Sequence, residues 1–300
     1  MRFDYLAPPT IKEAISLLSK YDGKAKVIAG GTDLMNLIRT KMIKPEYVVD
    51  IGHVPGLDYV KYDDKGALSI GALTTIRTLE MSAQVKERHP VICQAAAQLG
   101  SIAIRNVGTI GGNLCHASPA ADTAPSLIAL GARLKIVGPA GERAVALENF
   151  FTGPGQTALQ RREMVVEIQA PSMPPHTRGV YLKHSIRGAA DLAIVGVAVI
   201  ATSNGGCCRN VRIVLGAVAP TPMRARNAEE ALEGKEIDDA LIEKAAQAAA
   251  DESRPITDVR GSADYRKEMV KVFTRWAIRG VIPKEEAVNE TAHIIQQGEK

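Results

Sequence analysis

The spacing of apolar residues predicts a small α/β unit at the start of the chain. Thr10 and Glu13 form a capping box, and apolar residues at 11, 14, 15 and 18 follow at helical spacing. We expect this helix to end near Asp22-Gly23. Short apolar runs predict strands at 3–6, 26–29 and 47–50, the first of them an edge strand. Pro55-Gly56 then closes the unit.

A second series of strand and helix patterns fills residues 56–175. Thr74 is a candidate cap for a short helix, Pro90 begins a longer helix, and Asp122 is a candidate N-cap for a third. The longer expected helices cover 91–99 and 122–130, and the expected strands cover 68–71, 133–137 and 164–168. Turns are expected at 139–141 and 153–155. Three prolines within 171–175 mark the expected domain boundary.

Beyond these prolines, a run of strand patterns is followed by a run of helical patterns. Strands are expected at 179–185, 194–202 and 210–218, with a hairpin signal, Ser203-Asn-Gly-Gly206, between the last two. Helices are expected at 227–232, 238–250 and 263–279. This order predicts a separate α+β domain over 176–285 and a polar tail at 286–300, after a first domain at 1–175 divided near residue 55.

Composition excludes several functional classes. The 300 residues are 46% hydrophobic, which is enough for a large core, and the formal net charge is only +4. Aromatic residues make up 4%, and no basic run is interleaved with them, so we expect no nucleic-acid binding. No apolar run is long enough for a membrane span, and the N-terminus has no signal-peptide pattern, so a cytoplasmic location is expected.

The four cysteines match no metal or disulfide pattern. Cys93, Cys115, Cys207 and Cys208 form neither a C-x-x-C pair nor an iron–sulfur run. We therefore expect free thiols in a reducing compartment, and no metal site.

Two glycine-containing motifs are the candidate chemistry of the chain. Ala29-Gly-Gly-Thr-Asp-Leu34 follows an expected strand and leads into a helical pattern with Leu34, Leu37, Ile38 and Met42 on one face. This geometry presents backbone N–H groups to an anion, although neither a Walker nor a Rossmann fingerprint is present. Asp33 would repel a phosphate, so we expect its side chain to turn away and cap the helix.

The second motif, Thr109-Ile-Gly-Gly-Asn113, is expected in a polar loop that continues to Asp122. Gly111 and Gly112 can adopt positive φ and let a ligand approach the main chain. Two such loops suggest a ligand with two phosphates and a long body. The alternative is that both motifs are tight turns that only redirect the chain.

Several motifs, in the same order, resemble the FAD-binding medium subunit of molybdenum hydroxylases. That family includes the flavoprotein subunits of carbon monoxide, xanthine, nicotinate and quinoline dehydrogenases. The motifs that match are both glycine motifs, Ser118-Pro119, Asp122, Lys183-x-x-x-Arg187-x-x-x-Asp191-x-Ala193, Ala219-Pro-Thr-Pro222 and Ser262-x-x-Tyr265-Arg266. The resemblance implies an α+β fold, with a two-part FAD-binding domain of the vanillyl-alcohol-oxidase or PCMH type. A C-terminal domain with a three-stranded antiparallel sheet and a helical bundle follows it.

The resemblance also implies which residues bind FAD. The backbone of Ala29 to Thr32 would cradle the pyrophosphate, Thr109 to Asn113 would line the flavin side, and Asp122 would accept hydrogen bonds from ribityl or adenosine hydroxyls. The full expected set is Lys26, Val27, Ile28, Ala29, Gly30, Gly31, Thr32, Asp33, Leu34, Leu99, Thr109, Ile110, Gly111, Gly112, Asn113, Asp122, Val165 and Lys183. No catalytic and no metal-binding residue is expected.

Some of these residues have an equally ordinary structural interpretation. Leu99 and Val165 are also typical buried core residues, and Lys183 is alternatively a solvated strand lysine. As a cofactor contact, Lys183 would place positive charge near the isoalloxazine ring. Cys115-His116 is too little for a metal site, so both residues are interpreted as loop or flavin-edge packing.

The function implied by the resemblance is electron transfer within a larger complex. FAD would take electrons from a small [2Fe–2S] subunit and pass them to NAD+, a quinone or another acceptor. CO or an N-heterocycle such as xanthine or nicotinate would be oxidised on a large molybdopterin-binding subunit, in a dimer of heterotrimers. A stand-alone FAD-dependent reductase and a non-redox nucleotide-binding module remain alternatives. The residue patterns alone indicate a soluble α/β protein that binds a phosphorylated cofactor.

Overall fold

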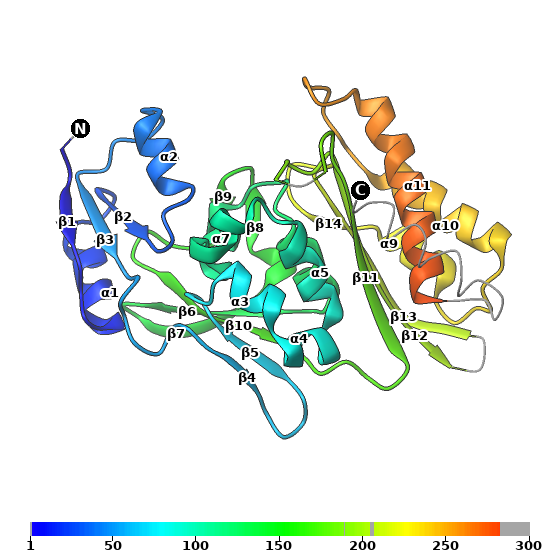
Figure 1. Ribbon diagram of the computed structural model, residues 1–300, viewed down its shortest axis with the longest axis horizontal. Helices are drawn as coiled ribbons and strands as arrows, with labels where there is room; N and C mark the ends of the chain where they lie inside the picture. The colour runs from blue at the N-terminus through cyan, green and yellow to red at the C-terminus, as the bar shows by residue number, and fades with distance from the viewer. Residues whose placement is uncertain (1, 189, 205–206, 283–300) are drawn as a thin grey trace. The chain divides into compact units, whose positions relative to one another are not determined.

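The computed structural model describes residues 2–188, 190–204 and 207–282 (Figure 1). The predicted tail at 286–300, and two residues of the predicted hairpin at 203–206, lie outside this part. The chain forms two compact units. The first contains residues 1–81, 101–118 and 131–172, and the second contains 82–100, 119–130 and the residues from 173 onward. The predicted domains of 1–175 and 176–285 are sequence intervals, whereas these units are interleaved along the chain.

The first unit begins with a three-stranded parallel sheet. Strands β1 (Asp4–Leu6) and β2 (Ala25–Ile28) both pair with β3 (Tyr47–Asp50), so the order is β1-β3-β2 and β1 is an edge strand as predicted. Helix α1 (Ile11–Lys20) lies between β1 and β2 in the sequence. The capping box predicted its start correctly, because Oγ1 of Thr10 accepts a hydrogen bond from the backbone N–H of Glu13 at 3.2 Å.

One hydrophobic core joins α1 to both sheets of this unit. The second sheet is antiparallel, in the order β4-β5-β10-β6-β7. Its strands are β4 (Val60–Tyr62), β5 (Leu68–Gly71), β6 (Arg133–Gly138), β7 (Gly141–Ala146) and β10 (Met164–Ala170). Ile15 and Leu18 of α1 pack in one cluster with Val49 of β3 and Val166 of β10. The two halves expected near residue 55 therefore share a core.

The sequence missed the short strands of this unit. The turn predicted at 139–141 joins β6 to β7, and Gly141 has a φ of 107° there, but β7 itself was not expected. Strand β4 was not expected either. A further short hairpin, β8 (Phe151–Gly153) with β9 (Gln156–Thr157), follows the 3-10 turn η1 (Leu147–Asn149). Runs of two to four residues carry too little periodicity to be recognised.

The helices of the first unit correct three predictions. They are α2 (Leu34–Arg39), α3 (Ile76–Met81), α6 (Ile102–Val107) and α7 (Ile110–His116). Met42 lies beyond α2 and is 74% exposed, so it does not share the apolar face of that helix. Thr75 rather than Thr74 supplies the hydroxyl at the start of α3, because Oγ1 of Thr75 accepts from the N–H of Thr78 at 3.0 Å. The predicted loop after residue 99 contains both α6 and α7.

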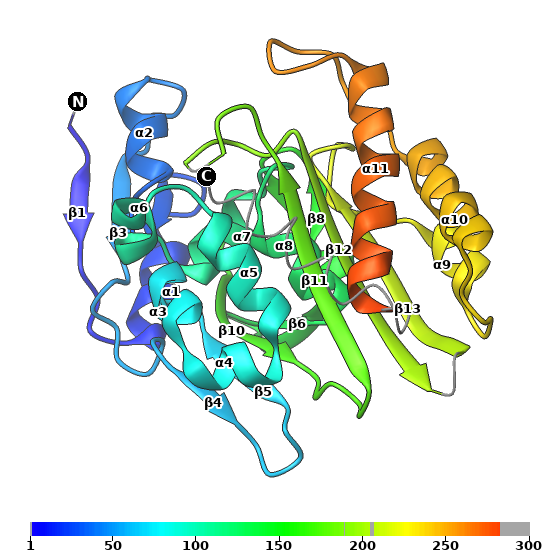
Figure 2. The same cartoon turned by 45° about the vertical axis from the view of Figure 1, so that its right-hand side comes forward.

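The second unit is built on an antiparallel sheet in the order β11-β12-β13-β14 (Figure 2). Its strands are β11 (Thr177–His184), β12 (Val195–Asn204), β13 (Cys207–Gly216) and β14 (Met223–Arg224). The three long strands confirm the prediction, and the two-residue β14 makes the sheet four-stranded instead of three-stranded. Full-length pairing of β11 with β12 places each residue of β11 on a defined face of the sheet.

Helices cover both faces of this sheet. On one face lie α9 (Arg226–Leu232), α10 (Asp239–Glu252) and α11 (Ala263–Val281), packed with Val197 and Val199 of β12 in one core. On the other lie α4 (Ala83–Arg88), α5 (Pro90–Gln98) and α8 (Thr123–Ala129). A Cβ on Gly179 would lie 3.3 Å from Val91 of α5, whereas Val180 belongs to the core of the first face. Successive strand residues point to opposite faces, which explains this division.

No helix in the described part of the chain is both long and apolar enough to cross a membrane.

Candidate functional site

The first glycine motif lies where β2 ends, and its two glycines are required for different reasons. Gly31 has a φ of 73°, a left-handed conformation that favours glycine. A Cβ on Gly30 would lie 1.8 Å from the carbonyl oxygen of Val107. The motif therefore packs its main chain directly against the end of α6, at a distance that no side chain allows.

The same motif presents unused backbone donors. The N–H groups of Gly30, Gly31 and Thr32 have no hydrogen-bond partner among the residues that the structure describes. The carbonyl oxygen of Gly31 accepts from Met35, so the chain turns into α2 directly after these donors. Consecutive free N–H groups suit the oxygens of a phosphate. The residues present therefore fit a phosphorylated cofactor at this motif.

Asp33 does not have the position that the sequence predicted. It stands at the N-cap of α2, but its side chain makes no capping hydrogen bond. Its Oδ1 lies instead 3.6 Å from Nε2 of His116, at the end of α7, and both side chains are partly exposed. The carboxylate has thus turned away from the free N–H groups, as expected, but toward an imidazole rather than toward the helix.

The second motif is a helix start, which corrects the prediction of a flexible loop. Thr109 is the N-cap of α7, and its Oγ1 accepts from the N–H of Gly112 at 3.1 Å. Gly111 and Gly112 are helical, so neither uses the positive φ expected of it. A Cβ on Gly111 would lie 2.7 Å from the carbonyl oxygen of Ala72. This glycine is needed because α7 lies close to the main chain of residue 72.

The two motifs meet within the first unit. Besides the contact of Gly30 with Val107, a Cβ on Gly108 would lie 3.7 Å from Oγ1 of Thr32. The residues that lead into the second motif therefore lie against the first. Val165, the other predicted residue of this unit, lies in β10, on which α7 packs, and its side chain is 4% exposed.

The predicted residues of the second unit also come together. Nζ of Lys183 donates to Oδ2 of Asp122 at 2.9 Å and to the carbonyl oxygen of Gln98 at 2.8 Å. Leu99 follows Gln98 as the C-cap residue of α5. Residues 99, 122 and 183 are far apart in the sequence, and the ends of α5, α8 and β11 gather them in one place.

Tyr181 belongs to this group and was not predicted. Its hydroxyl donates to Oδ1 of Asp122 at 2.8 Å, and its backbone N–H donates to Oε1 of Gln94 at 2.9 Å. Burial, together with the negative charge of Asp122, raises the pKa of Tyr181 well above its ordinary value, so the phenol stays a donor. The strand period of two, which puts residues 181 and 183 on one face, was the available signal.

Asp122 is held by these partners and not by a helix. It stands at the N-cap of α8 but makes no side-chain capping bond, which corrects that prediction. Burial raises the pKa of its carboxyl, while the Lys183 ammonium and the hydrogen bonds from Lys183 and Tyr181 oppose the rise. The Lys183 side chain is 2% exposed, so it is not the solvated strand lysine of the alternative interpretation.

Neither cysteine nor histidine chemistry is indicated beside the second motif. Burial raises the pKa of the Cys115 thiol to about 12, so the thiol stays protonated near neutral pH and is a poor nucleophile. No group of three or more His, Cys, Asp or Glu side chains that could hold a metal occurs among the residues described. His116 contacts Asp33 as described above.

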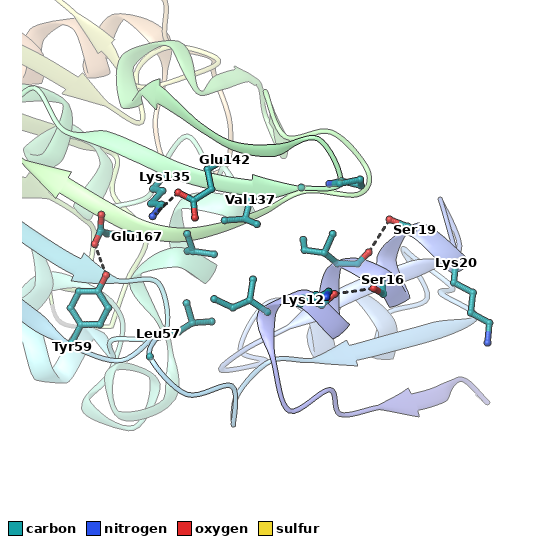
Figure 3. Close-up of a pocket in the computed structure, with 16 residues that line it drawn as sticks. Lys12, Ser16, Ser19, Lys20, Leu57, Tyr59, Lys135, Val137, Glu142 and Glu167 are labelled. Atoms are coloured by element: carbon teal, nitrogen blue, oxygen red, sulfur yellow. Dashed lines mark hydrogen bonds and ion pairs between the residues drawn. The ribbon is translucent and has the colours of Figure 1, made fainter.

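A separate pocket of about 960 Å³ lies between α1 and the antiparallel sheet (Figure 3). Its apolar floor includes Leu57 and Val137, and its charged groups pair with each other. Lys135 contacts Glu142 at 2.7 Å, and the Tyr59 hydroxyl donates to Glu167 at 2.5 Å. None of the predicted cofactor-binding residues lines this pocket, so it is not the predicted site.

Comparison with known proteins links both parts of the chain to one kind of protein. Residues 1–173 match the family model described as FAD binding domain in molybdopterin dehydrogenase. Residues 180–281 match the model described as CO dehydrogenase flavoprotein C-terminal domain.

Individual relatives are similar over nearly their whole length. The carbon monoxide dehydrogenase medium chain of Hydrogenophaga pseudoflava is 34% identical, over 92% of this chain and 96% of its own. The xanthine dehydrogenase FAD-binding subunit of Escherichia coli O157:H7 is 30% identical, over 91% and 94%. A solved structure of carbon monoxide dehydrogenase from Hydrogenophaga pseudoflava, which lacks the Mo-pyranopterin moiety of the molybdenum cofactor, superposes with a TM-score of 0.91 at 35% identity. It covers 94% of this chain and 97% of its own.

Proposed function

This chain belongs to the family of FAD-binding medium subunits of molybdenum hydroxylase-type oxidoreductases, and from this premise we propose that it carries electrons between an iron–sulfur subunit and a final acceptor. FAD supplies the redox chemistry, since it takes up electrons singly and releases them as a pair. The protein contributes binding, orientation and electrostatics.

The observation that supports cofactor binding most directly is the set of free N–H groups at Gly30, Gly31 and Thr32. They would donate to the pyrophosphate of FAD, at a motif fixed by its packing against Val107. Asp33 lies toward His116, which reduces the repulsion that a carboxylate would exert on a phosphate. We assign the remaining residues of the two motifs, and Val165, to the same cofactor.

In the second unit we assign Leu99, Asp122 and Lys183 to cofactor binding. The Asp122 carboxylate has two oxygens with several lone pairs, so it can accept from a ribityl or adenosine hydroxyl while it keeps Lys183 and Tyr181. Lys183 has a third N–H besides those given to Asp122 and Gln98. Its fixed positive charge would favour electron density arriving on the flavin.

The partners follow from the kind of complex. Two of the relatives are named medium chain and FAD-binding subunit, so they work with companion chains. We propose a small [2Fe–2S] subunit as electron donor and a large molybdopterin-binding subunit on which the substrate, CO or an N-heterocycle, is oxidised. A reduced cluster loses one electron in each transfer. NAD+ takes up the pair with one proton, whereas a quinone takes up the pair with two. A cytoplasmic dimer of heterotrimers is proposed with them.

The test is the visible spectrum of the purified chain, alone and with its co-purified partners, before and after denaturation. Flavin bands, with FAD released on unfolding, support the proposal, and added iron–sulfur absorption only with the partners supports the donor. A chain that stays colourless with excess FAD and its partners present would overturn it. Mixing the reduced complex with NAD+ or with a quinone then identifies the acceptor.

A further inference from the structure

Helix α6 exposes three large aliphatic side chains, which we call the α6 patch. Ile102 is 55% exposed, Ile104 is 39% exposed and Val107 is 50% exposed. Of the six residues of the helix, only Arg105 is buried. Single exposed apolar residues are ordinary, but three on one short helix form a patch that typically marks an interaction surface.

The helix is held by charge instead of by its apolar residues. Nε of Arg105 donates to Oε2 of Glu80 at 2.7 Å, and Nη2 donates to Oε1 at 3.3 Å. Glu80 also pairs with Arg77 at 2.9 Å. A helix of six residues is marginal by itself, so this anchoring to α3 stabilises α6 while its aliphatic side chains face solvent. Because Glu80 accompanies Arg105, the patch carries no unbalanced charge from its own helix.

The patch is continuous with the proposed cofactor motifs. The carbonyl of Val107 lies against Gly30, and Gly108 lies near Oγ1 of Thr32. The carbonyl of Gly108 also accepts from the N–H of Ile76 at 2.9 Å, which fixes the end of α6. The exposed aliphatic groups therefore stand directly before the second motif and against the first.

We propose that the α6 patch is the surface on which the iron–sulfur electron-donor subunit docks. This inference rests on the proposed function, because a donor is required only if the chain accepts electrons. Electron transfer slows steeply with distance, so a donor must dock beside the residues that bind the cofactor. An uncharged aliphatic patch fits the apolar centre of a protein interface and does not fit a nucleic acid or an acidic surface.

Ile102→Glu is the variant that tests the surface with least harm to folding. Residue 102 is exposed and lies in the first turn of α6, where an acidic side chain is favourable to the helix. The matched control is Ile256→Glu, which places the same charge at a 66% exposed isoleucine of the second unit. Each variant is produced together with the iron–sulfur subunit, and we measure FAD content, the mass of the complex and the dissociation constant for that subunit.

We expect Ile102→Glu to weaken binding of the iron–sulfur subunit at least about tenfold, because a charge replaces an apolar group buried in the interface. FAD content stays at the wild-type level, and Ile256→Glu retains both FAD and the subunit. Unchanged affinity in Ile102→Glu, with FAD bound, overturns the docking surface but leaves the proposed function intact. Loss of FAD in this variant also overturns it, since the residue is then a cofactor contact.

Two further outcomes separate the remaining explanations. If the wild-type chain alone is a dimer in light scattering, and Ile102→Glu makes it monomeric, the patch is an interface between two copies and the docking proposal is wrong. If the wild-type chain with its partners binds no FAD, the proposed function itself fails. A normal FAD content with a selective loss of the iron–sulfur subunit is the result that the docking proposal requires.

Discussion

The ammonium of Lys183 lies 2.9 Å from Oδ2 of Asp122, and their side chains are only 2% and 6% exposed. Each charge would be costly to bury alone, so each side chain depends on the other. Tyr181 and the carbonyl of Gln98 complete the hydrogen bonds of the pair. The two residues that the family resemblance assigns separately to the cofactor therefore act as one structural element.

Removing one member of this pair should destabilise the protein strongly. Lys183→Met leaves the Asp122 carboxylate buried without its cation, and we expect a loss of about 3–5 kcal/mol in the free energy of unfolding. Chemical denaturation of the apo protein measures it. The control, Lys24→Met, removes an exposed pair with Glu46 and should cost less than about 1 kcal/mol. Adding Asp122→Asn to Lys183→Met should recover part of the loss. Equal costs for the two lysine variants would contradict this account.

Tyr181→Phe tests whether the tyrosine holds Asp122. The change removes one hydrogen bond to a buried carboxylate, and we expect a cost of about 1.5–3 kcal/mol in the free energy of unfolding. Tyr5→Phe is the matched control, since the hydroxyl of Tyr5 donates to Asp50 at an exposed site and its loss should be nearly neutral. A neutral effect of Tyr181→Phe would show that Asp122 does not need this donor.

Gly30→Ala should displace the first motif. The added methyl would lie 1.8 Å from the carbonyl oxygen of Val107, so the main chain must shift. We expect FAD binding to weaken by about 1–3 kcal/mol, measured by titration of the apo protein with FAD. In the control Gly153→Ala, the methyl meets only the end of the Gln156 side chain at 3.3 Å. Wild-type FAD affinity in Gly30→Ala would mean that the cofactor does not use this motif.

Asp258 should contribute to stability against acid. Hydrogen bonds from Arg260, and then the hydrogen bond and charge of Arg266, lower the pKa of this carboxyl from 3.8 to about 2. Since the folded-state pKa is lowered, the contribution is fully present above pH 3.8 and is lost as the pH falls toward about 2. Asp258→Asn should therefore have a lower melting temperature at neutral pH and a flatter decline in that acid window. An unchanged pH profile would contradict the prediction.

The sequence predicted the elements whose signals are local. The capping box at Thr10, the proline that begins α5 and the three long strands of the second unit all depend on residues near each other in the chain. The same holds for the first motif, where a strand ends in two glycines. Such signals are independent of the rest of the fold, so they survive without knowledge of it.

The helical second motif could not be predicted for a physical reason. Gly111 and Gly112 are poor helix formers, so local propensity favours a loop. They are helical because α7 must approach the main chain of Ala72, a contact between distant residues. The meeting of Lys183 with Asp122 likewise depends on how β11 and α8 pack, which no spacing along the chain reveals.

The most direct test of the account is whether the flavin on this chain receives electrons from the iron–sulfur subunit. Without oxygen, large subunit or substrate, the chemically reduced iron–sulfur subunit is mixed rapidly with the oxidised FAD-loaded chain, and flavin absorbance is followed. We predict that the flavin bleaches as the clusters reoxidise, with one pair of electrons per FAD and a rate that rises with the concentration of the subunit. Fully bound FAD that stays oxidised beside clusters that stay reduced would contradict the account.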